Sequence, residues 1–485
     1  MLPQTANEAA GRFGDATAYV TEGGWPISYR DVDRVSDEVA AGLHARGIGL
    51  GDVVALELPP GPEYLLAYLG AAKVGAISAG VNTRLTRTER AAVLDLADPK
   101  LVVDTPAASS LENVLRELRD ADGAVPNLPG DPSRPVAIIF TSGTTGTPKG
   151  ALYTNRQLEF ITRTDVGDRW GGGARSFTGT SFAHLGFMTK LPGALRRGGT
   201  TFIMTRWSAG GALELLARER MTSVAGVPTQ LALMLRHPDF DRFDLDSLRA
   251  IVVGGGPITP GLAQEARRRF GAALSTRYSC TEAGIGLGTA FEDPEEDAIV
   301  SVGRPHPLVD LAVLSDDDMP VAPGNVGQVC LRSPAVMSGY WRDDTATKAA
   351  FTADGHVRTG DLGWVDDAGR LRLVGRTKEM YVRGGYNVYP VEVEAILSTH
   401  PEIAGVAVVP RDDAVMGEIG VAVVVPREGA APTLEELRAF AREQLAAYKL
   451  PEAIVLRDIL PLTAGDKLDR RALAQQLAEP DADVR

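Results

Sequence analysis

Apolar and polar positions in the first hundred residues follow two different periods. Residues 29–46 and 63–74 repeat apolar side chains at helical spacing, whereas residues 53–58 form an apolar run of strand length. A polar stretch over residues 107–134, which contains Pro126, Pro129 and Pro132, predicts a surface loop or a short helix. This order of elements predicts layered α/β structure.

The same alternation returns further along the chain. Residues 136–140 predict a strand, followed by a loop rich in Gly and Thr and by a helix over residues 155–163. Residues 251–253 predict another strand, followed by a Gly-rich loop and a helix that Thr259 caps and Pro260 begins. No fixed-period repeat is visible, so the pattern favours one large α/β body.

The last hundred residues read as a separate small unit. Residues 363–376 predict two short strands around an Asp-Asp-Ala-Gly turn. A helix near Pro390, strands at 406–409 and 421–425, and a helix that begins with a capping box from Thr433 to Glu436 follow. The sequence therefore predicts one large domain and one small one.

Composition narrows the class of protein. The chain has 485 residues with a formal net charge of −13 and no long basic run, so neither nucleic acid nor an anionic membrane is an expected partner. Cys280 and Cys330 form no CxxC pair, which excludes a disulfide framework and favours a reducing, cytoplasmic setting. Neither a signal peptide nor a transmembrane segment is predicted.

The segment after the strand at 136–140 carries the strongest chemical signal. It reads Thr-Ser-Gly-Thr-Thr-Gly-Thr-Pro-Lys-Gly over residues 141–150. Glycines let backbone N–H groups turn toward an anion, the hydroxyls add donors, and Lys149 adds a positive charge. It is not the P-loop of kinases and GTPases, because Pro148 precedes the lysine and Gly150 follows it. The loop therefore predicts a polyphosphate site of another kind.

This loop resembles the signature phosphate loop of the adenylate-forming superfamily, which contains acyl-CoA synthetases, luciferases and carrier-protein adenylation domains. The resemblance implies an α/β fold, with a large multi-subdomain N-terminal domain over residues 1–376 and a small, mobile α+β C-terminal domain over residues 377–485. It also implies that these residues bind the phosphates of ATP: Thr141, Ser142, Gly143, Thr144, Thr145, Gly146 and Lys149.

Three further segments resemble the family's nucleotide-binding motifs. The Gly-rich loop that includes Gly255, Gly256 and Pro257 resembles the loop that closes on adenine. The segment Arg-Tyr-Ser-Cys-Thr-Glu at 277–282 resembles the next motif, in which Tyr278 would lie on adenine, Thr281 would reach the α-phosphate, and Glu282 would hold Mg²⁺. Asp361 matches the residue that accepts hydrogen bonds from the ribose hydroxyls. Arg376 matches a residue that contacts the nucleotide.

The remaining family motifs concern movement and catalysis. Lys378 resembles the hinge residue between the two domains, and Gly384 and Gly385 resemble the loop that lines the tunnel for the thiol of CoA. Lys467 resembles the catalytic lysine near the C-terminus. The family pattern has glycine immediately before that lysine, whereas Asp466 stands there in this sequence.

The resemblance implies a two-step reaction. A carboxylate attacks the α-phosphorus of ATP, pyrophosphate leaves, and a thiol then attacks the acyl-adenylate to give a thioester and AMP. His184 lies in the segment that closes the carboxylate end of the acyl pocket, or else is a hydrogen-bonded core histidine. Because no aspartate stands in that segment to bind an ammonium group, we expect a small hydrophobic acid, fatty or aryl, rather than an amino acid.

Three alternatives remain open at this point. The acceptor can be CoA or the phosphopantetheine of an acyl carrier protein, because both present the same thiol. A luciferase-like oxygenation is less favoured, since nothing in the sequence indicates light emission. A nucleotide-binding protein without turnover is favoured only by Asp466, and the joint presence of Glu282, Asp361, Arg376 and Lys467 argues against it.

Overall fold

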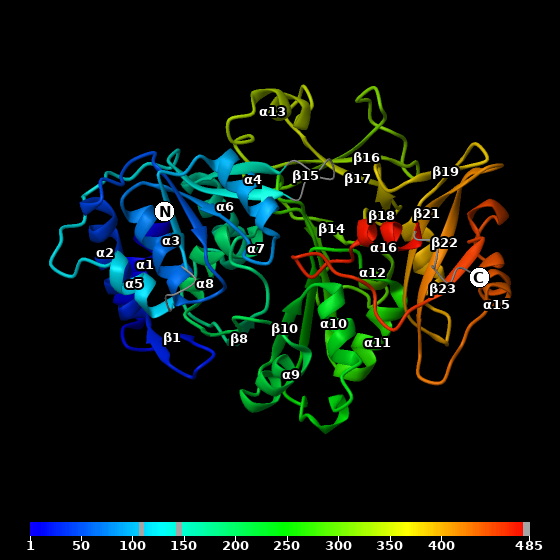
Figure 1. Ribbon diagram of the computed structural model, residues 1–485, viewed down its shortest axis with the longest axis horizontal. Helices are drawn as coiled ribbons and strands as arrows, with labels where there is room; N and C mark the ends of the chain where they lie inside the picture. Colours follow the sequence, from blue (N-terminus) through cyan, green and yellow to red (C-terminus); the bar gives the residue numbers. More distant parts are fainter. Residues whose placement is uncertain (106–110, 142–147, 479–485) are drawn as a thin grey trace. The chain divides into compact units, whose positions relative to one another are not determined.

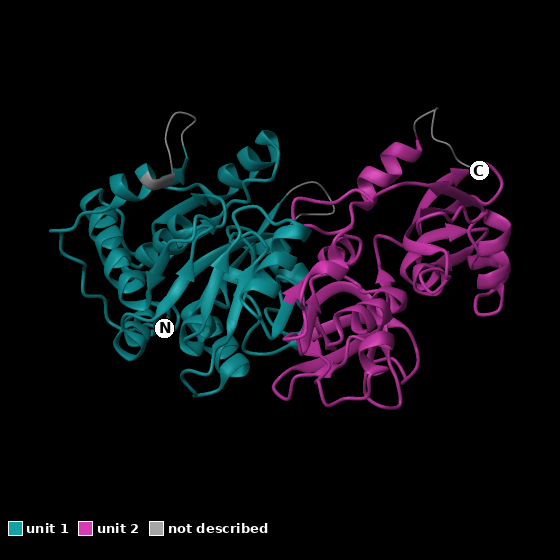
Figure 2. Ribbon diagram, turned by 90° about the horizontal axis from the view of Figure 1, so that it is seen from below, with its two compact units in different colours: residues 1–224, 280–285, 332–357 teal, residues 225–279, 286–331, 358–485 magenta. Residues whose placement is uncertain are grey.

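The computed structural model describes residues 1–105, 111–141 and 148–478 and divides the chain into two compact units (Figure 1, Figure 2). Unit 1 comprises residues 1–224, 280–285 and 332–357, and unit 2 comprises residues 225–279, 286–331 and 358–485. Both sides of the domain boundary predicted at residues 376 and 377 lie in unit 2, so that boundary stays a prediction.

Unit 1 is built around a mixed sheet with strand order β5-β3-β4-β6-β7. Its strands are β3 (Val53–Glu57), β4 (Ile77–Gly80), β5 (Leu101–Asp104), β6 (Pro135–Thr141) and β7 (Lys149–Thr154). The β3–β4, β3–β5 and β4–β6 pairs are parallel, whereas β6 and β7 are antiparallel. A second sheet has the order β2-β1-β9-β8. It contains β1 (Thr17–Val20), β2 (Pro26–Ser28), β8 (Arg175–Thr178) and β9 (Thr200–Ile203).

The helices of unit 1 confirm the predicted α/β alternation. They are α1 (Leu2–Phe13), α2 (Tyr29–Ala45), α3 (Pro62–Lys73), α4 (Arg87–Ala97), α5 (Leu111–Leu118), α6 (Asn155–Val166), α7 (Leu185–Met188), α8 (Leu191–Arg197), α9 (Ala209–Arg218) and α13 (Asp344–Ala350). The α2 helix begins where Ser28 and Asp31 form a capping box, and its buried face repeats at helical spacing. The stretch at 107–134 contains the short helix α5, one of its two predicted forms.

One predicted connection was incomplete. The sequence predicted that the Gly/Thr loop leads from the strand at 136–140 directly into a helix, but the strand β7 intervenes and pairs with β6 from Thr141 to Pro135. The sequence pattern did not predict β7, because the strand is only six residues long and its first two residues belong to the loop signature. The predicted phosphate loop therefore joins two antiparallel strands.

Unit 2 begins with a sheet of order β10-β11-β12-β13-β14. Its strands are β10 (Ser223–Gly226), β11 (Ala250–Gly254), β12 (Ala273–Tyr278), β13 (Leu287–Gly288) and β14 (Arg304–Pro305). Its helices are α10 (Pro228–Leu235), α11 (Pro260–Phe270) and α12 (Asp297–Val300), and a 3-10 turn spans Phe240–Arg242. Thr259 caps α11 and Pro260 begins it, as predicted.

A four-stranded sheet follows, with order β15-β16-β17-β18. Its strands are β15 (Asp310–Leu314), β16 (Gly327–Arg332), β17 (Val357–Val365) and β18 (Leu371–Arg376). The predicted strand pair around the Asp-Asp-Ala-Gly turn is confirmed, although β17 begins earlier than the pattern indicated. Asp361 consequently lies within a strand, opposite Arg376.

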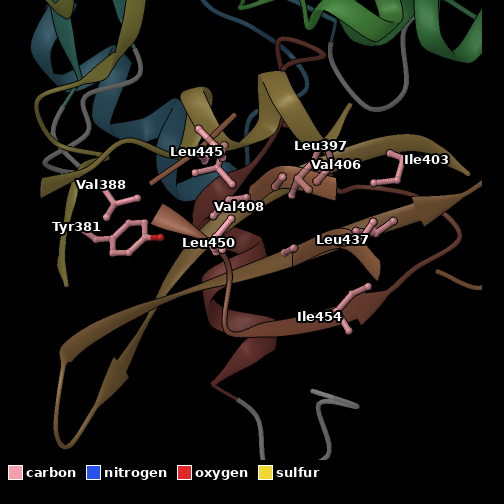
Figure 3. Packing of buried hydrophobic residues seen from close by; sticks show 14 residues of the cluster. Tyr381, Val388, Leu397, Ile403, Val406, Val408, Leu437, Leu445, Leu450 and Ile454 are labelled. Carbon is pink, nitrogen blue, oxygen red and sulfur yellow. The ribbon is translucent and has the colours of Figure 1, made fainter. Parts of the chain in front are cut away.

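The C-terminal part of unit 2 is a sheet of order β20-β19-β22-β21, with β23 paired to β22. Its elements are β19 (Tyr381–Arg383), β20 (Tyr386–Val388), α14 (Pro390–Leu397), β21 (Ile403–Asp413), β22 (Gly417–Pro426), α15 (Leu434–Arg442), a 3-10 turn at Ala447–Lys449, β23 (Ala453–Leu456) and α16 (Arg470–Leu477). Alternate residues of β21 and β22 face opposite sides of this sheet. Val406 and Val408 join the cluster with α14 and α15 shown in Figure 3, whereas Ala407 and Val409 pack with Leu473 of α16.

No helix in the described part of the chain is long and apolar enough to cross a membrane.

Candidate active site

The ends of the predicted phosphate loop are fixed by the β6–β7 pair in unit 1. Thr141 ends β6, Lys149 begins β7, and the two residues lie opposite each other. The Thr141 hydroxyl donates to the Lys149 carbonyl oxygen at 3.5 Å. Five predicted phosphate-binding residues lie outside the described residues: Ser142, Gly143, Thr144, Thr145 and Gly146.

Gly150 is required by the packing beneath this loop. A Cβ atom at Gly150 would lie 2.6 Å from Ile138 Cγ2 and 3.1 Å from Phe140 Cε1, which is closer than side chains approach. Both contacts come from β6, the strand paired to Gly150. A glycine here lets β7 lie close against β6 and holds Lys149 at the end of the strand.

A second backbone connection brings Tyr340 to Lys149. Residue 340 forms an antiparallel bridge with Ala151 of β7, and the Trp341 N–H donates to the Gly150 carbonyl oxygen at 2.7 Å. The Lys149 Nζ atom lies 5.0 Å from the centroid of the Tyr340 ring. An ammonium group at this distance from an aromatic face is attracted by the negative charge of the π-system.

Tyr340 also holds the predicted magnesium ligand. Its hydroxyl donates to Glu282 Oε1 at 2.7 Å, and the Met337 N–H donates to the Glu282 carbonyl oxygen at 2.9 Å. Burial, and then the negative charge of Glu282, raise the pKa of the Tyr340 phenol well above its usual range. The phenol therefore stays protonated at neutral pH and acts as a donor. Lys149, Tyr340 and Glu282 thus form one connected set.

The backbone of Thr281 is held by a buried tyrosine. The Tyr153 hydroxyl, from β7, donates to the Thr281 carbonyl oxygen. Burial raises the pKa of Tyr153 well above its usual value, and the nearby Cys280 and Glu282 raise it further. The donor therefore stays protonated. Sequence reasoning missed Tyr153 and Tyr340 because nothing in the chain order shows which tyrosines meet the 281–282 segment.

His184 is hydrogen-bonded and half-buried, in the segment predicted to close the acyl pocket. The Asn82 side-chain nitrogen lies 3.0 Å from His184 Nε2. With the amide donating, the neutral imidazole carries its proton on Nδ1. Asn82 is buried and follows β4, and no sequence pattern indicated its contact with His184. The hydrogen bond agrees with the expected alternative of a hydrogen-bonded core histidine, but His184 is half-buried rather than in the core, and a role at the pocket stays a prediction.

Aromatic side chains surround the segment that carries His184. Phe182 and Phe187 stack with ring centroids 3.7 Å apart and an interplanar angle of 4°. Tyr64 of α3 meets both rings edge-on at 5.8 and 5.9 Å, and its hydroxyl lies 3.5 Å from Met188 Sδ. Tyr64 and Phe182 are buried, at 0% and 1% exposed, so these rings pack against one another inside unit 1.

In unit 2, Asp361 joins two other predicted nucleotide residues. The Tyr278 hydroxyl donates to Asp361 Oδ2 at 2.7 Å, and Arg376 Nε donates to Asp361 Oδ1 at 3.0 Å. Asp361 is buried, and the β17–β18 register sets it opposite Arg376. The structure therefore brings three of the residues predicted to bind the nucleoside into one cluster.

The predicted adenine loop lies next to the predicted catalytic lysine. Gly255 has φ +80°, in the left-handed region that favours glycine. A Cβ atom there would lie 3.3 Å from Val227 Cγ1 and 3.7 Å from Lys467 Cε. Gly256 and Pro257 are exposed beside it. Gly255 and Lys467 are 212 positions apart in the chain and belong to the same unit.

The hinge and tunnel residues occupy turns of unit 2. Lys378 is exposed in a turn that follows β18. Gly384 and Gly385 have φ +55° and +87° and form the two-residue loop between β19 and β20, where Arg383 pairs with Tyr386. Two consecutive positive φ angles are typical of the type I′ hairpin turn, which explains the Gly-Gly pair.

Glu282 is the predicted ligand for a divalent cation. Among residues 1–105, 111–141 and 148–478, no group of three or more His, Cys, Asp or Glu side chains is arranged to hold a metal ion. Mg²⁺ commonly takes only one or two protein carboxylates and completes its shell with phosphate oxygens and water. A carboxylate oriented by Tyr340 fits an ion that arrives with ATP.

Known proteins resemble the chain over nearly its whole length. Residues 6–341 match the family described as AMP-binding enzyme, and residues 392–467 match the AMP-binding enzyme C-terminal domain. A feruloyl-CoA synthase from Amycolatopsis sp is 34% identical, over 93% of this chain and 94% of that protein. An indoleacetate–CoA ligase from Aromatoleum aromaticum is 33% identical, over 93% of each. The crystal structure of ATP-bound MatB from Rhodopseudomonas palustris has a TM-score of 0.87 and 26% identity, over 99% of each chain.

Proposed function

The chain belongs to the AMP-binding enzyme family, and from that premise we propose that it activates an aromatic carboxylic acid with ATP and transfers the acyl group to CoA. The products are the acyl-CoA thioester, AMP and pyrophosphate. The resemblance to the adenylate-forming superfamily seen in the sequence is confirmed, and with it the activity class of an AMP-forming acid–thiol ligase.

One observation carries this proposal. The similarity to the feruloyl-CoA and indoleacetate–CoA ligases extends over 93% of the chain. Both of those proteins are named for acids with an aromatic ring. The segment that carries His184 also carries the stacked Phe182 and Phe187, so its surroundings are apolar, which supports a hydrophobic acid as the substrate.

In the first half-reaction, a carboxylate oxygen of the acid attacks the α-phosphorus of ATP. The bond from that phosphorus to the bridging oxygen breaks, and pyrophosphate leaves with the electron pair. Thr141 and Lys149 bind phosphate oxygens and Thr281 reaches the α-phosphate, and Glu282 would hold a Mg²⁺ ion, which would neutralise phosphate charge. Tyr340 orients Glu282 through their hydrogen bond.

Tyr278, Asp361 and Arg376 bind the nucleoside, and Lys467 is the mobile lysine. Tyr278 lies on adenine, and Asp361 accepts hydrogen bonds from the ribose hydroxyls while Arg376 contacts the nucleotide. Lys467 donates to the oxygens that gain negative charge as the α-phosphorus is attacked. Lys467 lies close to Gly255 in the predicted adenine loop, and this closeness supports the role.

In the second half-reaction, the thiolate of CoA attacks the acyl carbonyl carbon, and AMP leaves with the former carboxylate oxygen. Lys467 must leave the nucleotide for this step, so the small domain turns about Lys378 and presents the Gly384-Gly385 loop instead.

CoA is favoured over an acyl carrier protein because the relatives named above are CoA ligases. We place the reaction in the cytoplasm, since a chain with only two cysteines, Cys280 and Cys330, and no CxxC pair suits a reducing compartment.

The test is to incubate the protein with ATP, Mg²⁺ and single acids, with and without CoA, and to measure acyl-AMP and acyl-CoA by mass spectrometry. The panel contains hydroxycinnamic, arylacetic, medium-chain fatty and amino acids. We expect acyl-AMP without CoA and thioester with it, for an aromatic acid. Turnover confined to fatty acids would contradict the aromatic assignment, and acyl-AMP formation without any thioester would contradict CoA as acceptor.

A further inference from the structure

The segment that carries Lys467 is a tight hairpin built on Thr463. The Thr463 N–H donates to the Lys467 carbonyl oxygen at 2.7 Å, and the Asp466 N–H donates to the Thr463 carbonyl oxygen at 3.0 Å. The Thr463 hydroxyl accepts from the Lys467 N–H at 3.3 Å. Leu462 and Leu468 close the hairpin by an antiparallel bridge. The turn is therefore rigid within itself, and its position depends on what holds it from outside.

Asp466 has the backbone angle of a glycine position. Its φ is +58°, in the left-handed region, and aspartate is one of the few residues other than glycine that adopt it regularly. This explains how aspartate can replace the glycine of the family pattern without changing the turn. Backbone geometry alone does not explain why a carboxylate stands there, because glycine would adopt the same angle with less strain.

The carboxylate of Asp466 turns inward. Only 7% of Asp466 is exposed, although the residue lies in a surface hairpin. Gln230 Nε2 donates to Asp466 Oδ2 at 3.5 Å, and Gln230 is itself 2% exposed. Gln230 is fixed in turn, because its Oε1 accepts from the Val227 N–H at 3.2 Å. Val227 also packs beside Gly255, so Gln230 belongs to the framework of the adenine loop.

We propose that Asp466 is a positioning residue whose hydrogen bond with Gln230 holds the Lys467 hairpin against the Gly255 loop, in the arrangement used for adenylate formation. The inference rests on the proposed function for its kinetic consequence, but the hydrogen bond itself does not. Lys467 acts on the phosphate, whereas Asp466 acts through Lys467.

Other contacts of the same kind lie further from Lys467. Arg427 Nη2 donates to Glu265 of α11 at 2.9 Å, and Arg236, which follows α10, donates to the Ala404 carbonyl oxygen. Both contacts join the α10–α11 region of unit 2 to its C-terminal sheet, but neither involves a residue of the hairpin that carries Lys467. These two contacts orient the C-terminal sheet, whereas Asp466 and Gln230 position the hairpin that carries Lys467.

The kinetic test measures the two half-reactions separately in three variants of the Asp466–Gln230 pair and in one control variant. Asp466→Gly keeps the left-handed turn and removes the carboxylate, Asp466→Asn keeps an oxygen acceptor, and Gln230→Ala removes the donor. Loss of a single hydrogen bond of this type predicts about a three- to tenfold slower adenylate formation for Asp466→Gly and for Gln230→Ala. Asp466→Asn should retain most of the rate. Thioester formation from supplied acyl-AMP should not slow in any of them. Asp458→Asn, at an exposed site nearby, is the matched control.

The double variant gives the sharpest outcome. If the two side chains act through one hydrogen bond, Asp466→Gly combined with Gln230→Ala should be no slower than either single variant. Multiplied losses in the double variant, or a parental adenylation rate in Asp466→Gly, would overturn the proposal.

Amide hydrogen exchange tests the hydrogen bond without substrate. We expect the peptide that spans residues 461–469 to exchange faster in Asp466→Gly and in Gln230→Ala than in the parent, while a peptide from β22 stays unchanged. Unchanged exchange at 461–469 would overturn the proposal even in a protein that makes no acyl-AMP. If exchange is accelerated in the two variants but the parent protein makes no acyl-AMP, the result would support the hydrogen bond and count against the proposed function.

Discussion

The phenol of Tyr340 donates a hydrogen bond to Glu282 at 2.7 Å, although 58 positions separate the two residues in the chain. The Lys149 ammonium lies over the same ring, 5.0 Å from its centroid. One tyrosine thus contacts both the lysine predicted to bind phosphate and the carboxylate predicted to bind Mg²⁺. It does so because the segment around residue 340 pairs with β7.

Tyr340→Phe should raise the Mg²⁺ concentration needed for half-maximal adenylate formation by about three- to tenfold, because the Glu282 carboxylate loses the donor that orients it. The measurement is pyrophosphate exchange over a Mg²⁺ titration. Tyr29→Phe is the control, since the phenol of Tyr29, which is buried, donates to the Gly199 carbonyl oxygen at 2.7 Å in the same unit. An unaltered Mg²⁺ titration in Tyr340→Phe would remove Tyr340 from the metal site.

Asp361→Asn should weaken ATP binding by about three- to thirtyfold, because a neutral amide replaces the carboxylate proposed to accept from the ribose hydroxyls. Isothermal titration calorimetry with ATP measures this directly. Asp366→Asn is a matched control, since Asp366 pairs with Arg370 and Arg372 on the same β17–β18 hairpin. Equal loss in both variants would assign the effect to the hairpin rather than to ribose contacts.

Lys378→Pro should separate the two half-reactions. Proline fixes φ near −65° and removes an N–H, so a pivot at residue 378 could no longer change its backbone angles. We expect the variant to keep either pyrophosphate exchange or thioester formation from supplied acyl-AMP, and to lose the other. Circular dichroism first confirms that the variant is folded. Retention of both activities would place the pivot elsewhere in the chain.

Lys467→Ala should reduce adenylate formation by about a hundredfold or more, since a charged donor to the transition state is lost. Thioester formation from supplied acyl-AMP should stay within about threefold of the parent. Lys449→Ala serves as the control, because Lys449 pairs with Glu392 away from the hairpin. Similar losses in both half-reactions would contradict the assignment of Lys467 to the first step.

Elements with a strong local signal were predictable from the sequence. Ser28 and Asp31 mark the start of α2, and Thr433 and Glu436 mark the start of α15, because a capping box requires only residues three positions apart. The strand β7 was missed since its first two residues belong to the loop signature, and only the pairing of Thr141 with Lys149 reveals it.

The residues predicted for the nucleotide site stand in sequence motifs, whereas the residues that contact them do not. Tyr278, Asp361 and Arg376 each stand in a recognisable segment, and the structure brings them into one cluster. Asn82 and Tyr340 have no such motif. They reach His184 and Glu282 through strand pairing and packing between distant segments, which a single sequence does not encode in local spacing.

The central claim is that the carboxylate of the acid becomes bonded to the α-phosphorus of ATP. Oxygen labelling tests it most directly: the protein is given ATP, Mg²⁺, CoA and an accepted aromatic acid with ¹⁸O in both carboxylate oxygens, and the AMP is analysed by mass spectrometry. The account predicts AMP that carries one ¹⁸O atom, because the bridging oxygen of the acyl-adenylate leaves with phosphorus when the thiol attacks. Unlabelled AMP, or ADP in its place, would contradict the account.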